Sequence, residues 1–127
     1  MATRLTQSER EKYLASIGAV LDQQARRQQT LTYLELADAV AMPGPQRIHR
    51  VTRLLEILMQ RDATAGRPIR SALAVSRVGQ GLPAAGFFDR AARLGLFDGK
   101  DPAGFHRRQL EALFAGAGSA RVSPVEL

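Results

Sequence analysis

Arginine is the side chain with the most chemistry to offer in this sequence, and three arginines recur at every third position. Arg47, Arg50 and Arg53 have this spacing, and His49 lies between the first two. Residues three apart lie along one flank of an α-helix. A guanidinium group donates paired hydrogen bonds to a phosphate, to a carboxylate or to the edge of a guanine base. The row therefore predicts a surface that binds anions.

The placement of the charge supports this interpretation. The formal net charge is +6, and residues 46–77 carry seven arginines against only Glu56 and Asp62, whereas residues 1–45 carry five basic and five acidic side chains. Arg67, Arg70 and Arg77 extend the basic segment beyond the first row. A local excess attracts phosphate, while scattered charges mainly favour solubility. The alternative is a solvated face in which Arg53 pairs with Glu56 three residues later.

Apolar spacing and capping signals predict the elements that position these side chains. Thr6 with Glu9, and Thr32 with Glu35, have the spacing of capping boxes that begin a helix. Alternation of Ile69, Ser71, Leu73 and Val75 with smaller or charged residues is typical of a strand. We expect helices over 7–28, 33–41, 45–60, 86–94 and 102–115, and a strand over 69–78.

The segment 32–62 is typical of a helix-turn-helix. Met42-Pro43-Gly44-Pro45 stops the second helix, and Pro45 is suited to be the first residue of the third. Two helices joined by a tight break, the second of them basic, have the order of elements found in this motif. The predicted fold is one helix-rich, winged-helix-like α+β domain over residues 1–115, with a flexible tail over 116–127. The second strand of the wing is expected in 82–85 or near Leu96-Phe97.

Residues 32–47 resemble the DNA-binding part of the alkylguanine-DNA alkyltransferase and alkyltransferase-like family. The resemblance rests on Thr32-Tyr33-Leu34-Glu35-Leu36-Ala37 followed by Pro43 and Arg47. It implies a helix-turn-helix and makes Arg47 the residue nearest a duplex. The family's Pro-Cys-His-Arg-Val box is absent, and Pro68-Ile69-Arg70-Ser71 at the nearest position lacks the nucleophile, the histidine and an aromatic ring. Residues 67–95 are similar to small uncharacterised bacterial proteins, through residues 67–75, Gly81-Leu82-Pro83 and Gly86-Phe87-Phe88. This likeness indicates nothing about an activity.

Several classes of chemistry lack the residues that they need. The chain has no cysteine, which excludes disulfides and thiolate chemistry and makes a reducing cytoplasm the expected compartment. His49 and His106 fall on different predicted helices without further ligands, so no metal or other cofactor is predicted. Gly79-Gln80-Gly81 is interpreted as a turn, not a phosphate-binding loop, because Leu82-Pro83 follows it. No apolar run is long enough to span a membrane, and no catalytic residues are marked.

Two hypotheses for the function follow. The first is a double-stranded DNA-binding protein that inserts helix 45–60 into the major groove. The second is a protein-interaction or structural domain, able to form homo-oligomers through an apolar surface around Phe87-Phe88, which otherwise packs in the core. A small enzyme is a third and weaker alternative, because it would need a polar pocket with convergent titratable groups. The residues predicted to contact nucleic acid are Arg47, His49, Arg50, Arg53, Arg67, Arg70 and Arg77.

Overall fold

The computed structural model describes residues 4–78 and 80–122, and the side chains as far as Ala117. It is a helix-rich α+β fold with a two-stranded sheet. The elements in chain order are α1 (Gln7–Arg27), β1 (Leu31–Thr32), α2 (Tyr33–Ala39), α3 (Arg47–Thr64), the 3-10 helix η1 (Arg70–Leu73), β2 (Ala74–Val75), α4 (Ala85–Arg93) and α5 (Pro102–Val122).

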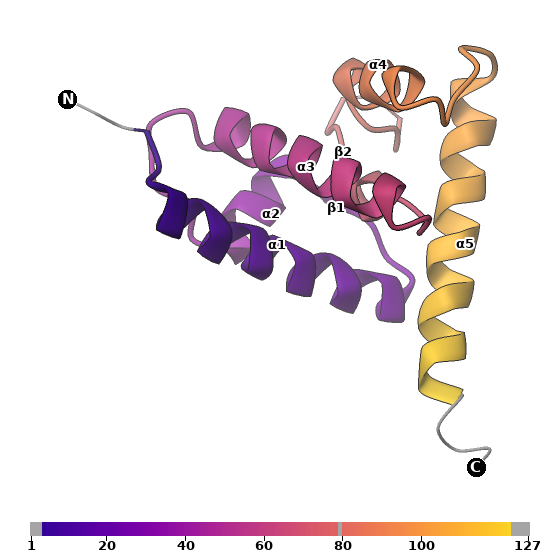
Figure 1. Cartoon of the computed structure of the whole chain (residues 1–127), viewed down its shortest axis with the longest axis horizontal. Helices are drawn as coiled ribbons and strands as arrows, with labels where there is room; N and C mark the ends of the chain where they lie inside the picture. The colour runs from indigo at the N-terminus through magenta and orange to yellow at the C-terminus, as the bar shows by residue number, and fades with distance from the viewer. Residues whose placement is uncertain (1–3, 79, 123–127) are drawn as a thin grey trace.

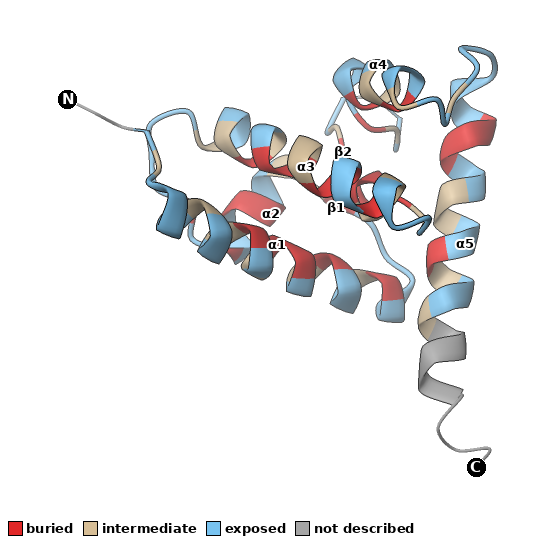
Figure 2. Ribbon diagram, viewed as in Figure 1, coloured by how far each residue is buried: buried red, intermediate tan, exposed pale blue. Residues whose placement is uncertain are grey.

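The long helices surround one apolar core. α1 and α3 lie side by side with α2 behind them, while α5 stands across one end of the pair and α4 lies beside α3 (Figure 1). The buried stripes of α1 and α3 face each other and α2 (Figure 2). Within the described part of the chain, every helix is too short or too polar to cross a membrane. The fully buried aliphatic side chains include Leu14, Ile17, Leu21, Leu36, Val51, Ile69 and Leu73.

Both predicted capping boxes are confirmed. The Thr6 hydroxyl accepts a hydrogen bond from the Glu9 N–H at 3.1 Å, and the Glu9 carboxylate accepts one from the Thr6 N–H at 2.8 Å. Thr32 and Glu35 make the same reciprocal pair, also at 3.1 and 2.8 Å. Each box satisfies two backbone N–H groups that a helix start leaves without partners. These local contacts therefore set the first residues of α1 and α2.

Helices α1 to α4 are each followed, within two residues of their last residue, by a residue with a positive φ angle. These residues are Gln28, Ala41, Gly66 and Gly95, with φ between 53° and 78°. After each of them, the next N–H reaches back five residues to a helix carbonyl, as between Met42 and Ala37 at 2.9 Å. This is the Schellman arrangement, which favours glycine because the left-handed region crowds a Cβ atom.

The third helix differs from the prediction at both ends. It begins at Arg47, not at Pro45, because Gln46 adopts a φ of 59° and interrupts the helix between them. It continues to Thr64, four residues beyond the predicted end. The last helix is longer as well, because α5 runs on to Val122 through much of the predicted flexible tail. Residues 123–127 of that tail lie outside the described residues.

The strand predicted over 69–78 is wrong for most of its length. Residues Arg70–Leu73 form the 3-10 helix η1, and only Ala74 and Val75 are in a strand. This strand pairs in parallel with β1, in the register Leu31 with Ala74 and Thr32 with Val75. Ser71 to Val75 are all buried, so the alternation in residue type does not mark one exposed and one covered face.

A wing requires an antiparallel hairpin, and the described residues contain a single strand pair, which is parallel. The segments in which the second strand was expected, 82–85 and 96–97, are not strands. The winged-helix form of the fold is therefore not confirmed. Gly79, in the predicted turn, lies outside the described residues.

A buried carboxylate joins the end of α3 to η1. Asp62 is fully buried, and Arg70 binds it through Nε to Oδ2 at 3.1 Å and Nη2 to Oδ1 at 3.0 Å. The backbone N–H of Arg70 donates to Oδ2 at 3.1 Å, and Arg67 donates to Oδ1 at 2.9 Å. Asp22 of α1 lies 3.5 Å from the remaining Arg70 nitrogen. Burial by itself lowers the pKa of Arg70, but the bonds and charges of Asp62 and Asp22 outweigh it and raise that pKa.

We predict that Asp62→Ala lowers the free energy of unfolding by about 3–5 kcal/mol, because it removes four hydrogen bonds to one buried carboxylate and leaves the largely buried Arg70 guanidinium group without them. Asp22→Ala is the matched control. It removes a half-exposed carboxylate from the same Arg70 and should cost less than about 1 kcal/mol. Urea unfolding of both variants measures the difference. Equal losses in the two variants would contradict the assigned role of Asp62.

Two side chains of α5 satisfy the backbone of the 69–72 segment. Gln109 Oε1 accepts a hydrogen bond from the Ile69 N–H at 2.9 Å, and His106 Nε2 lies 2.8 Å from the Ala72 carbonyl oxygen. A carbonyl can only accept, so Nε2 of His106 carries the proton. His106 is 4% exposed, and the Phe87 ring packs edge-on against it. Burial lowers the pKa of His106 below its usual 6.5, opposed by the bond to Ala72.

We predict that His106 makes the protein less stable in mild acid. The unfolded chain takes up the proton near pH 6.5, whereas the folded chain takes it up only at lower pH, so stability is full above this range and decreases as pH falls below it. The slope approaches about 1.4 kcal/mol per pH unit for one proton. Unfolding by urea at pH 7.5 and 5.5 measures the change. His106→Gln should reduce the difference between the two pH values, and an unchanged difference would assign it to other groups.

Candidate nucleic-acid interface

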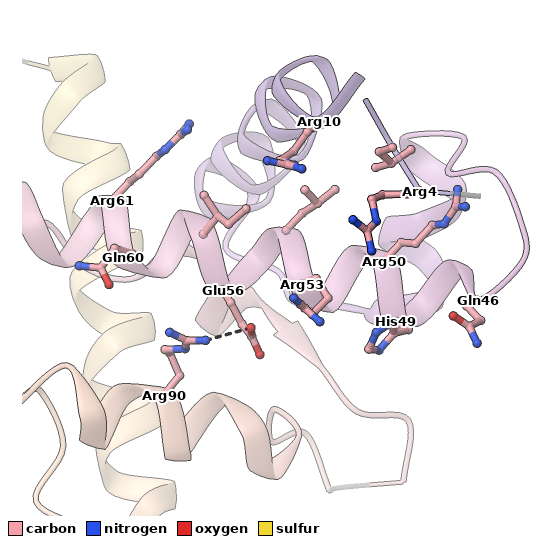
Figure 3. A pocket seen from close by; sticks show the side chains of 13 residues that line it. Arg4, Arg10, Gln46, His49, Arg50, Arg53, Glu56, Gln60, Arg61 and Arg90 are labelled. Carbon is pink, nitrogen blue, oxygen red and sulfur yellow. Dashed lines mark hydrogen bonds and ion pairs between the residues drawn. The ribbon is translucent and has the colours of Figure 1, made fainter. Parts of the chain in front are cut away.

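The basic side chains converge on one open cleft of about 990 Å³ along α3 (Figure 3). α3 forms the floor, the chain start and α1 form one wall, and α4 contributes the other. Glu56 is the one carboxylate among the described residues that line it. Its ionisable and polar lining residues are Arg4, Arg10, Gln46, His49, Arg50, Arg53, Glu56, Gln60, Arg61 and Arg90.

Three residues of the predicted site lie together on the floor. His49 and Arg53 are one helical turn apart on the solvent face of α3, opposite the buried stripe that begins at Val51. Within the described residues, neither side chain has a hydrogen-bond or charged partner, so both present their polar groups to solvent. Arg50 is half-buried, and its Nη1 donates to the Pro43 carbonyl oxygen at 3.2 Å. The predicted contacts His49, Arg50 and Arg53 thus form one surface.

The walls add cations that the sequence did not single out. Arg4 precedes α1, Arg10 lies in its first turns, and in Figure 3 both lie on the α1 side of α3. Arg61 pairs with Glu11 of α1 at 3.1 Å, an exposed contact that leaves half of each side chain in solvent. Packing of α1 against α3 brings these groups together, although residues 1–45 carry no net charge in the sequence.

The opposite wall depends on Tyr33. Its hydroxyl accepts a hydrogen bond from the Ala84 N–H at 2.9 Å, which fixes the chain just before α4 begins. Burial raises the pKa of Tyr33, and the bond to Ala84 opposes that effect. α4 then presents Arg90, whose Nη2 donates to Glu56 Oε1 at 3.0 Å. Glu56 therefore pairs across the cleft with Arg90. The solvated-face alternative expected it to pair with Arg53, and it does not.

Four of the predicted contacts lie elsewhere. Arg67 and Arg70 bind Asp62, and with Arg26 they border a different cleft between α1 and α5. Arg77 is exposed in the loop after β2 and does not line the basic cleft. The guanidinium group of Arg47 points towards the α2–α3 turn. Its Nη2 donates a hydrogen bond to Asp38 Oδ1 at 2.8 Å, and its Nε donates one to the Met42 carbonyl oxygen at 2.7 Å.

The other features singled out in the sequence have structural roles. Among the described residues, no group of three or more histidine, aspartate or glutamate side chains could hold a metal ion. At the position of the alkyltransferase box, Ile69 is buried and Ser71 lies within the 3-10 helix η1. The rings of Phe87 and Phe88 are 5.1 Å apart, and Phe88 packs on Phe97 at 5.7 Å. Phe87 is buried, so this pair belongs to an aromatic cluster between α4 and α5.

We predict that Arg47 stabilises the turn between α2 and α3. Arg47→Ala should lower the free energy of unfolding by about 1–2 kcal/mol, because it removes two charge-assisted hydrogen bonds across residues 38–47. Chemical unfolding of Arg47→Ala, Asp38→Ala and the double variant separates the ion pair from the bond to Met42. A loss in Arg47→Ala no larger than that in Asp38→Ala would show that the Met42 contact contributes nothing.

Comparison with known proteins does not extend this description. No family model, curated protein or solved structure matches the chain. The resemblance of residues 32–47 to the alkyltransferase family therefore rests on the quoted residues, and the function is argued from the cleft.

Proposed function

We propose that this chain binds double-stranded DNA, with α2 and α3 as a helix-turn-helix and the basic cleft as the surface that meets the duplex. One observation carries the proposal: six arginines from the chain start, α1, α3 and α4 surround a single open cleft whose one lining carboxylate, among the described residues, is Glu56. Basic side chains clustered on one face are the electrostatic footprint of a protein that binds the phosphate backbone of a nucleic acid.

The arrangement of charge around α3 fits a duplex. The major groove of B-DNA is about 12 Å wide, admits one α-helix and is bordered by phosphates of both strands. The exposed stripe of α3 would face the groove, with Arg4 and Arg10 on the α1 side and Arg90 on the α4 side, next to the bordering phosphates. Arg67 and Arg70 are among the predicted nucleic-acid contacts, but both bind Asp62, so we assign the phosphate contacts to the cleft arginines.

The second hypothesis, a protein-interaction domain, has less support from the structure. Its expected surface, Phe87-Phe88, is taken up by the aromatic cluster with Phe97 and Phe105. Exposed guanidinium groups such as that of Arg53 favour a phosphate-bearing partner instead.

We predict that Arg53→Ala and Arg10→Ala each weaken duplex binding and reduce its salt dependence. The logarithm of the binding constant should fall linearly with the logarithm of salt concentration, and each lost phosphate contact should reduce the slope by about 0.9. Fluorescence anisotropy of a labelled 20-base-pair duplex, between about 25 and 200 mM salt, gives both quantities. The double variant should lose about twice the slope.

Arg27→Ala is the matched control, because it removes an exposed arginine at the opposite end of α1, about 25 Å along the helix from Arg10. It should leave the affinity and the slope close to those of the native chain. Failure of the native chain to bind at the lowest salt would rule out the proposal. An equal effect of Arg27→Ala would show that only total charge matters and that the cleft is not the site.

A further inference from the structure

An apolar groove adjoins the basic cleft at the start of α3. It has a volume of about 610 Å³, and its apolar lining comes from Leu34, Pro45 and Ile48. Ile48 is 46% exposed and Leu34 is 36% exposed, although the helices that carry them, α3 and α2, bury other apolar side chains in the core. Among the described residues, the other large hydrophobic side chains in the exposed class are Val78 and Leu96.

The groove and the basic cleft form one continuous surface. Gln46 and His49 line both of them. Neither side chain makes a hydrogen bond to another described residue, so the Gln46 amide and the His49 ring remain available to a ligand. A partner that covers the groove must therefore also face the guanidinium groups of the cleft, which favours a ligand with apolar groups beside phosphates.

The polypeptide holds this surface in a fixed shape. Arg47 lines the groove, but its guanidinium group points back to Asp38 and to the Met42 carbonyl oxygen. These bonds span the turn that carries Gln46, and Ile48 follows Arg47 directly in the first turn of α3. Gln46 also has a φ of 59°, which orients its side chain differently from that of a residue inside the helix. Arg47 is thus a positioning residue for its two neighbours.

The chemistry of the major groove identifies a matching ligand. Its edges display hydrogen-bond donors and acceptors, and the C5-methyl group of thymine is its apolar feature. Aliphatic side chains contact this methyl group, and a glutamine amide pairs with N6 and N7 of adenine. Ile48 with Leu34, and Gln46 beside them, supply both kinds of contact at the end of α3 that a helix-turn-helix directs towards base edges.

We propose that this groove recognises A·T base pairs in duplex DNA, with Ile48 and Leu34 on the thymine methyl group and Gln46 on the adenine. The inference rests on the proposed function and adds to it a preference for base sequence. The cleft arginines supply affinity without regard to sequence, whereas the groove distinguishes one base pair from another.

Replacing thymine by uracil tests the inference, because it removes the methyl group and keeps the pairing with adenine. Competition anisotropy compares an alternating adenine–thymine duplex with its adenine–uracil counterpart at one salt concentration. The native chain should bind the thymine duplex about fourfold more tightly for each methyl group that it covers. Ile48→Ala should lower this ratio, and the double variant Ile48→Ala with Leu34→Ala should bring it near one. The salt dependence should be kept in both, because the phosphate contacts are unchanged.

Leu96→Ala is the matched control, since it truncates another exposed aliphatic side chain, 41% accessible, that does not line this groove. It should leave the thymine-to-uracil ratio unchanged. Ile48 is exposed, so thermal unfolding should show that Ile48→Ala is folded.

Three outcomes would overturn the inference alone, and a fourth would overturn the proposed function on which it rests. If the native chain binds both duplexes equally, while Arg53→Ala still weakens binding, then the groove does not recognise thymine. The proposed DNA binding by the cleft would remain supported. A ratio that is not reduced in Ile48→Ala would place the recognition elsewhere. A dimer in size-exclusion chromatography that Ile48→Ala dissociates would make the groove a contact between two copies. Absence of binding to either duplex at low salt would reject the proposed function itself.

Discussion

The bonds to the carboxylate of Asp62 are the interaction on which the arrangement of this protein depends. A fully buried negative charge is tolerated only when fixed donors replace its water. Arg67, Arg70 and one backbone N–H supply those donors, and in doing so they fix the path of the chain from α3 into η1. Arg70 also passes so close to α1 that a Cβ atom at Gly18 would lie 3.1 Å from its Nη1. One carboxylate thereby sets the positions of three segments.

The parts of the fold that depend on local chemistry could be predicted from the sequence. Thr6 with Glu9, and Thr32 with Glu35, begin helices because the residues that satisfy the first N–H groups are three positions away. The residue pattern of 69–78 predicts a strand, but the conformation of this segment depends on distant partners. Asp62 holds the N–H of Arg70, and α5 holds the backbone at Ile69 and Ala72. Nothing within those ten residues reveals these contacts.

The candidate site could likewise be predicted where it depends on one helix, and could not where it depends on packing between helices. His49, Arg50 and Arg53 could be grouped from their spacing because one helix presents all three. The charge count of residues 46–77 treated its arginines as equivalent, whereas buried Asp62 holds two of them and Asp38 a third. Arg4, Arg10 and Arg90 enter the cleft through helix packing, and a linear charge profile cannot show that. The count of positive charges was informative, but which of them face solvent is a property of the fold.

The contacts between α5 and the 69–72 segment limit how this chain can be divided. Gln109 and His106 satisfy one backbone N–H and one backbone C=O that lie in the interior, forty and thirty-four residues earlier in the sequence. Ending an expression clone after α4 would leave the Ile69 N–H and the Ala72 C=O without their hydrogen-bond partners. Water would not replace those partners readily, because Ile69 and Ala72 are almost inaccessible. A shortened clone of this kind would therefore be a poor starting point for crystallisation or spectroscopy, and isotope-labelled samples should retain α5.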